Sequence, residues 1–174
     1  RFGATQRLSA AGVRSLVAGA PRLAELRLDG AGLGGHAARA IAEHAGALRR
    51  LFLASNPAVD DAAVAALALG CPRLEQLGLA YNHKVTTVGL AHFADPNARA
   101  RGTITAINVA YCPGVDDAAV ALLSTCPAMK ELAVCISPAG NPNITERTRC
   151  RGTIVREISM PLPINPHLID ALMQ

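Results

Sequence analysis

Residues 71–90 read CPRLEQLGLAYNHKVTTVGL, and the spacing inside this stretch, Leu74-x-x-Leu77-x-Leu79, recurs along the chain. Equivalent frames are Leu23-x-x-Leu26-x-Leu28, Leu48-x-x-Leu51-x-Leu53, Ile104-x-x-Ile107-x-Val109 and Met129-x-x-Leu132-x-Val134. Successive frames begin 25, 26, 30 and 25 residues apart. Self-similarity at a period of this length is typical of a solenoid of stacked repeats. Such a solenoid usually offers its surface to a partner.

The last positions of each frame alternate apolar residues with other residues, which predicts a strand with one buried face. We expect these residues to point inward: Leu26, Leu28, Leu51, Leu53, Leu77, Leu79, Ile107, Val109, Leu132 and Val134. A small or polar residue follows three positions later: Ala31, Asn56, Asn82, Cys112 or Ser137. Where this residue is polar, its side chain can hydrogen-bond backbone groups that the turn leaves unpaired.

A helix is then predicted, because an apolar residue and a helix-capping residue follow each turn. The pairs are Leu8-Ser9, Val59-Asp60, Val85-Thr86 and Val115-Asp116. Proline follows the expected helix ends at Gly19-Ala20-Pro21, Gly70-Cys71-Pro72 and Thr125-Cys126-Pro127, where it cannot continue a helix. One repeat is therefore strand, turn and helix. The fold class that follows is an α/β solenoid with a curved parallel sheet and helices on its convex face.

The repeats set the expected domain organisation. Residues 8–20 match the second half of a repeat, and Val155-x-x-Ile158-x-Met160 suggests a sixth, weaker strand. We expect one domain over 1–174 with about six strands, open at both ends. It comprises regular repeats over 8–135, an irregular repeat over 136–162 and a terminal segment over 163–174. Neither end resembles the polar cap that a solenoid needs, so we expect a fragment of a chain that continues at least N-terminally.

Composition narrows the function classes. Hydrophobic residues make up 51% and aromatic residues 3%, without Trp, which suits thin stacked layers. No run of 18 apolar residues predicts a membrane span, and no signal peptide is visible. The net charge of +4 fits an acidic protein partner and is weak evidence for nucleic acid. Five cysteines without a CxxC pair indicate reduced thiols and an intracellular location.

Enzyme chemistry is not predicted, although one glycine motif keeps a nucleotide-binding enzyme as an alternative. Residues 30–35, GAGLGG, satisfy G-x-G-x-x-G after a strand and before a helix. The acidic residue that binds ribose about 20 residues later is absent, however, and the repeat itself explains the glycines. The histidines show no ligand spacing, and the pairs Asp60-Asp61 and Asp116-Asp117 fit helix capping. We therefore expect no catalytic residue, no metal and no cofactor.

The repeats follow the pattern Cys-Pro-x-Leu-x-x-Leu-x-Leu-x-x-Asn/Cys-x-x-Val-Asp/Thr-x-x-Val/Gly, and residues 71–90 and 104–129 carry it best. This pattern resembles the cysteine-containing class of leucine-rich repeats over roughly residues 8–135. The resemblance implies protein–protein interaction. Its members include F-box proteins that capture ubiquitin-ligase substrates, a subunit of the ciliary nexin–dynein regulatory complex, and a shorter relative associated with mitochondrial ATP synthase. Residues 89–93, GLAHF, followed by an Arg-containing insertion, are similar to the ciliary subunit, which implies a cytoplasmic or axonemal location, with the mitochondrion as an alternative.

The outward positions of the strands form the first candidate surface. The first two repeats carry charged residues and one aromatic residue, whereas the later repeats carry mainly Ala, Gly and Asn. We predict partner binding centred on Phe52, with Arg27, Arg50 and Gln76 around it, because aromatic residues often anchor interfaces. Tyr81 and Tyr111 occupy equivalent positions just after their strands. We expect them to stack along one edge, and ordinary turn packing is the alternative.

A basic edge is the second candidate surface. Two polar insertions, 94–102 and 137–152, precede strands two repeats apart. They carry Arg99 and Arg101 in the first, and Arg147, Arg149 and Arg151 in the second. Neighbouring strands lie about 5 Å apart, so the two groups should lie roughly 10 Å from each other. This edge fits an acidic protein partner, and a pair of solvated loops is the alternative.

Overall fold

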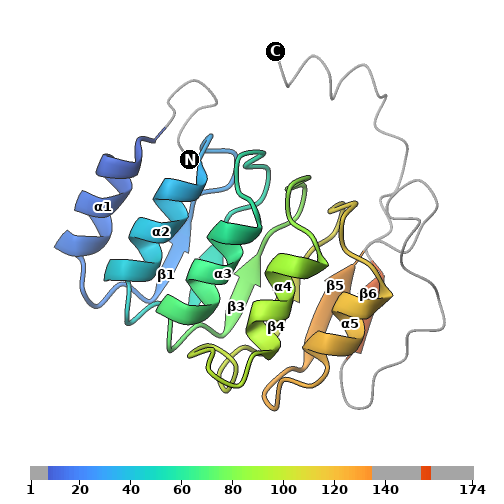
Figure 1. Ribbon diagram of the computed structural model, residues 1–174. Helices are drawn as coiled ribbons and strands as arrows, with labels where there is room; N and C mark the ends of the chain where they lie inside the picture. Colours follow the sequence, from blue (N-terminus) through green and yellow to red (C-terminus); the bar gives the residue numbers. More distant parts are fainter. Residues whose placement is uncertain (1–7, 135–153, 158–174) are drawn as a thin grey trace, which may run out of the picture.

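Strands and helices alternate along the residues that the computed structural model describes, 8–134 and 154–157. The strands are β1 (Glu25–Arg27), β2 (Arg50–Phe52), β3 (Gln76–Gly78), β4 (Ala106–Asn108), β5 (Glu131–Val134) and β6 (Ile154–Glu157). They form one parallel sheet in chain order, β1 to β6. The helices are α1 (Ala10–Gly19), α2 (Gly35–His44), α3 (Asp61–Gly70), α4 (Thr87–Ala94) and α5 (Asp117–Leu123). They line up as one layer beside the sheet (Figure 1), which confirms the predicted α/β solenoid.

The predicted inward residues form the core. The middle residues of successive strands are register partners, from Leu26 and Leu51 through Leu77 and Ile107 to Leu132. All ten predicted inward residues are buried, and the most exposed of them, Leu26, is 8% exposed. A slip of one residue would turn each row toward solvent. The strand register derived from the frame is therefore confirmed for β1 to β5.

The sixth strand exists, but its predicted register is wrong by three residues. The frame places Ile158 beside Leu132, whereas the structure pairs Leu132 with Val155. The strand covers Ile154–Glu157 and so begins with the β-branched residues Ile154 and Val155, which favour strands. Of the irregular repeat predicted over 136–162, only this strand lies within the described residues, and the segment 163–174 lies outside them.

The helices begin at the predicted caps. Four N-cap side chains each accept a hydrogen bond from a backbone N–H of the first turn: Ser9, Asp60, Thr86 and Asp116. The fifth helix start, at Gly34, has no side-chain cap. Asp61 ties neighbouring repeats together, because its carboxylate accepts the Thr86 backbone N–H at 2.7 Å and the Thr86 hydroxyl at 2.6 Å. The Thr86 cap thus fixes both the start of α4 and its position against α3.

Buried asparagines join the turns, as the sequence predicts. Asn56 is 0% exposed; its amide nitrogen donates to the carbonyls of Leu28 and Leu53, both at 2.9 Å. Its side-chain oxygen accepts the Leu33 backbone N–H of the preceding repeat, also at 2.9 Å. Asn82 accepts the Asn56 backbone N–H at 2.7 Å in the same way. These bonds form a ladder across successive repeats and satisfy backbone groups that have no access to water.

Candidate functional site

The side of the sheet away from the helices carries a shallow hollow, and we call this side the open strand face. Each strand from β3 to β5 carries one small outward residue, which is Gly78, Ala106 or Ala133. The hollow has a volume of about 200 Å³, and these residues line it: Phe52, Gln76, Leu77, Gly78, Ala106, Ile107, Asn108, Glu131 and Ala133. Two residues of the predicted surface, Phe52 and Gln76, are therefore among the residues that line this shallow hollow.

Phe52 is held in place by its neighbours on both sides. A Cβ atom added at Gly78 would lie 2.8 Å from Cδ1 of Phe52, so the ring rests over the glycine of the next strand. On the other side the Arg27 guanidinium carbon lies 4.0 Å from the ring centroid, which is a cation–π contact. Phe52 is consequently half-buried, less exposed than the sequence suggests, and it lines the hollow.

The two arginines of the predicted surface share one carboxylate. The Glu25 carboxylate accepts one hydrogen bond from Nε of Arg27 at 2.8 Å and another from Nε of Arg50 at 2.7 Å. These hydrogen bonds, from Arg27 first and Arg50 second, lower the pKa of Glu25. This cluster of three side chains carries two positive charges and one negative charge. Gln76 is the register partner of Arg50 and is exposed, so the structure brings Phe52, Arg27, Arg50 and Gln76 together.

The tyrosines stack as expected. The ring centroids of Tyr81 and Tyr111 lie 4.5 Å apart with planes 8° from parallel. They pack on a separate small cluster that contains Ala54, Ala80 and Ala110. Tyr81 has φ 62° and Tyr111 has φ 60°, in the left-handed region that non-glycine residues seldom adopt. Gly30 occupies the equivalent position of the first repeat with φ 63°, so the turn itself demands this conformation.

The first half of the basic edge is packed rather than loose. In the insertion 94–102, Ala98 and Ala100 are buried in the core, and the Ala100 backbone N–H donates to the Ala68 carbonyl at 3.1 Å. Arg99 is exposed. Arg101 is half-buried, and its guanidinium donates to the Thr125 carbonyl at 3.4 Å, just after α5. Arg147, Arg149 and Arg151 lie outside the described residues, so the distance between the two groups stays a prediction.

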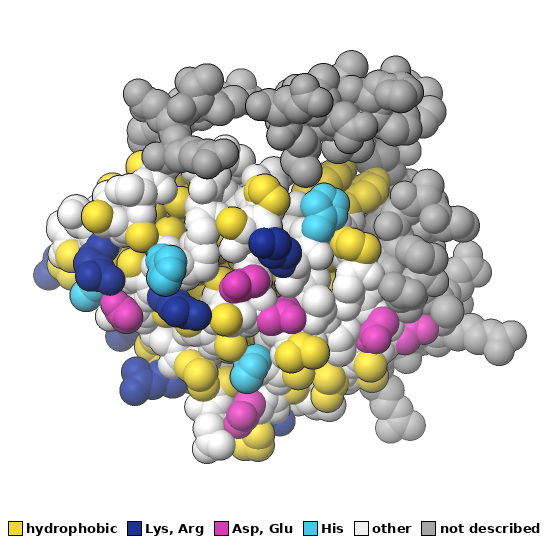
Figure 2. Space-filling view, turned by 45° about the horizontal axis from the view of Figure 1, so that its top comes forward, with side chains coloured by type: hydrophobic (Ala, Val, Ile, Leu, Met, Phe, Trp, Pro, Cys, Tyr) yellow, Lys and Arg dark blue, Asp and Glu magenta, His cyan; other side chains and the backbone are white. Residues whose placement is uncertain are grey.

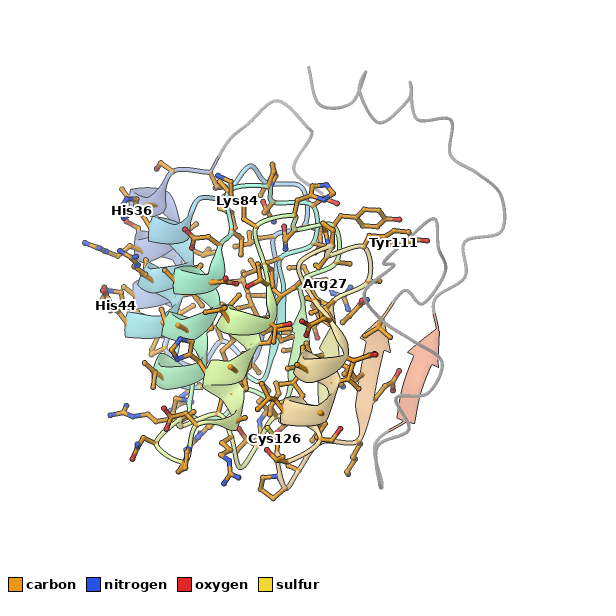
Figure 3. All side chains as sticks on the ribbon, turned by 45° about the vertical axis from the view of Figure 1, so that its right-hand side comes forward. Arg27, His36, His44, Lys84, Tyr111 and Cys126 are labelled. Carbon is orange, nitrogen blue, oxygen red and sulfur yellow. The ribbon has the colours of Figure 1, made fainter. Side chains whose placement is uncertain are left out.

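The described surface that Figure 2 shows carries side chains of both charges. In Figure 2, basic, acidic and histidine side chains alternate across the described surface in view. Figure 3 places Tyr111 and Cys126 at opposite ends of the strands. The tyrosine stack and the Arg101 insertion, which reaches the Cys126 end, therefore lie at different edges of the solenoid.

The glycine motif of residues 30–35 adopts the turn of the repeat. Leu33 is 1% exposed and donates its backbone N–H to Asn56, and Gly34 is the N-cap of α2.

Within the described residues, no group of three or more His, Cys, Asp or Glu side chains could hold a metal ion. Burial raises the pKa of Cys71 to about 12 and that of Cys112 to about 11, so both thiols are protonated near neutral pH. The buried side chains of Cys71 and Cys112 are part of the core of the repeats.

No helix in the described part of the chain has both the length and the apolar character that crossing a membrane requires.

No protein-family model and no curated protein matches the chain. Among solved structures, it is similar to a chain of the yeast Rad7–Elc1 complex, with a TM-score of 0.63 and 17% sequence identity. The match covers 79% of this chain and 33% of that chain, so this chain spans about a third of the protein it resembles. At this identity the likeness concerns the fold. Together with the parallel sheet and its helix layer, it shows that the chain has the architecture of an α/β leucine-rich-repeat solenoid.

Proposed function

We propose that the chain is a non-enzymatic scaffold that binds a protein partner through the open strand face. The observation that carries this proposal is the hollow between Phe52 and Ala133, with its floor of small residues. Its volume of about 200 Å³ lies below the roughly 300–1,000 Å³ of typical small-molecule sites. It suits a single apolar side chain of a partner segment better than a cofactor.

The groups around the hollow match what a protein interface needs. Phe52 supplies a ring already fixed by Arg27 and Gly78, so little conformational freedom remains to be lost on binding. Gln76 and Asn108 offer side-chain amides at the rim, where a partner backbone can form hydrogen bonds. An aromatic anchor inside a polar rim is the arrangement common at binding hot spots.

At a finer level, we propose that the scaffold is a subunit of a larger intracellular assembly such as the ciliary axonemal dynein regulatory complex. The support is the leucine-rich-repeat pattern of residues 71–90 and 104–129, together with residues 89–93 and the arginine-containing insertion after them. The same pattern supports a second candidate, the substrate-recognition module of an F-box-type ubiquitin ligase. An F-box-like helical segment upstream of residue 1 in the natural chain would favour the ligase. Isolation of the native complex followed by identification of its subunits separates the two.

The open strand face is tested by Phe52→Ala. We expect the affinity for the co-purified partner to fall by about 2 kcal/mol, roughly 30-fold, because a truncated interface aromatic commonly costs this much. Ala106→Leu should weaken binding as well, since it fills the hollow without touching the ring. Val88→Ala is the control, because this exposed side chain belongs to the helix layer. Unchanged affinity in both test variants, with an intact thermal transition, would remove the open strand face as the binding site.

The basic edge has its own test, the replacement of Arg99, Arg101, Arg147, Arg149 and Arg151 by Ser. For an acidic partner we expect weaker binding and a shallower dependence on salt, because exposed charges are screened over about 10 Å at 0.1 M. Binding is measured across a salt series. Arg99→Ser alone is the cleaner comparison, because Arg101 also contacts the end of α5. Equal affinities and equal salt slopes for all three proteins would mean that the edge is a solvated surface.

A further inference from the structure

Helix α1 differs from the later helices in which side it exposes. Seven residues after the N-cap, an apolar side chain occurs in every helix: Leu16, Ile41, Leu67, Phe93 and Leu123. The last four of these side chains are 0% exposed, whereas Leu16 is 48% exposed. Three residues after the N-cap, the small residue of α2 to α5 is buried, whereas Gly12 of α1 is exposed. The same two positions are thus buried in α2 to α5 and exposed to solvent in α1.

The positions three and ten residues after the N-cap face the preceding helix of the row, and the position seven residues after it lies between them on the same side of the helix. A Cβ atom added at Gly89 of α4 would lie 2.5 Å from Oδ1 of Asp61 in α3. One added at Gly70, the last residue of α3, would lie 2.5 Å from the Ala42 carbonyl oxygen of α2. On α1, a Cβ atom at Gly12 would meet only its own cap, Ser9, at 3.4 Å. Gly19, at the position equivalent to Gly70, would meet nothing within 4 Å.

The rest of α1 is packed normally, so the bare side is not a sign of a loose helix. Val13 and Val17 are 0% exposed, and the Ser9 cap is formed. The row of helix contacts runs without interruption from α1 to α5. In Figure 1, α1 stands at the end of this row with its outer side uncovered by any described element. The exposed side of α1 therefore corresponds to the side that each of the helices α2 to α5 packs against the helix before it.

We propose that the stripe Gly12, Leu16 and Gly19, which we call the α1 end face, docks one further strand–helix unit of the same solenoid type. Its helix stacks on α1 as α1 stacks on α2. The occupant presents a small residue opposite Gly19, because Gly70 meets Ala42 in this way. It also covers Leu16, as α2 to α5 are covered at this position. This surface is separate from the open strand face, so the inference does not depend on the proposed function.

The probe is the chain's own second repeat. Residues 34–59 are duplicated and placed directly before Ser9, in place of residues 1–8. This repeats the natural junction between residues 34–59 and the Asp60 cap. Leu16→Asp is introduced into both the parent chain and the extended chain, and the thermal midpoints are measured. Leu69→Asp, at a side chain 46% exposed in the last turn of α3, is the matched control, because Leu16 is 48% exposed in the last turn of α1.

We expect the extended chain to melt higher than the parent, because each stacked unit adds a neighbour interface. Leu16→Asp should leave the parent midpoint within about 2 °C, yet lower that of the extended chain by more than about 6 °C. Leu69→Asp should change the midpoint of both chains by the same small amount. A second extension with residues 60–85 repeats the comparison if the first does not fold.

Two results would overturn the proposal. One is that neither extension raises the midpoint or makes position 16 sensitive to Asp. The other is that Leu16→Asp destabilises the parent just as strongly and converts a dimer in sedimentation to a monomer, since a second copy would then be the occupant.

Discussion

Leu77→Ala lowers the free energy of unfolding by roughly 2–5 kcal/mol, as expected for a fully buried leucine. Leu77 is 2% exposed and lies in the middle of the inward row, beside Leu51 on β2 and Ile107 on β4. Both neighbours belong to other repeats. The cavity left by the substitution therefore opens inside the contact between three repeats, where the surrounding side chains cannot collapse freely.

Gln76→Ala is the matched control, one residue earlier on the same strand. Its side chain is exposed, so we expect a change within about 0.5 kcal/mol. The two variants are compared by urea denaturation, with attention to whether the slope stays constant. Equal losses of stability would contradict the inward position of Leu77, since adjacent strand residues point to opposite faces.

The repeat frame predicts the fold because each of its positions has one physical role. A leucine at the inward position can be buried only if the strand has the observed register, and an Asp or Ser before the helix can cap only one first turn. Leu51, Leu77 and Asp60 illustrate this, since their places follow from spacing alone. The same reasoning gave the Tyr81–Tyr111 stack, because equivalent positions of neighbouring repeats lie about one strand spacing apart.

Features that depend on departures from the frame could not be derived in this way. The direction of the Phe52 ring follows from the missing side chain at Gly78, a contact between strands that the one-dimensional pattern does not contain. The burial of Ala98 and Ala100 turns a segment that looks polar in sequence into part of the core. The register of β6 was wrong because the frame was extended into a region where apolar residues are spaced irregularly.

The hollow on the open strand face illustrates the same limit. The sequence shows that Gly78, Ala106 and Ala133 are small and point outward, and this much was predicted. Whether small residues form a flat surface or a depression depends on the larger side chains beside them. Here Phe52 lies across Gly78 at one side and forms a wall, which gives the depression its boundary.

Asn56→Ala is expected to cost about 2–4 kcal/mol, because one truncation removes the side-chain hydrogen bonds to three carbonyls and leaves the buried Leu33 N–H without a partner. The Asn56 side chain donates to the carbonyls of Leu28, Leu53 and Ala54 and accepts the backbone N–H of Leu33. It is 0% exposed, so water cannot replace these bonds without opening the turn. The Leu33 N–H immediately precedes the Gly34 cap of α2, so the loss should reach the start of that helix.

Two further variants make the Asn56 prediction specific. Asn56→Cys should lose less stability than Asn56→Ala, because Cys112 fills the equivalent position and its thiol donates to the Leu79 carbonyl at 3.2 Å. Asn97→Ala is the control at an exposed asparagine and should leave stability within about 0.5 kcal/mol of the parent. Chemical denaturation gives the energies, and hydrogen exchange at Leu33 reports whether its N–H has become accessible. If Asn56→Ala matches Asn97→Ala in both measurements, the buried amide does not contribute to holding the repeats together. If the order Ala below Cys below Asn is found, the ladder stabilises the stack through the donors that each side chain supplies to the carbonyls of the repeat before it.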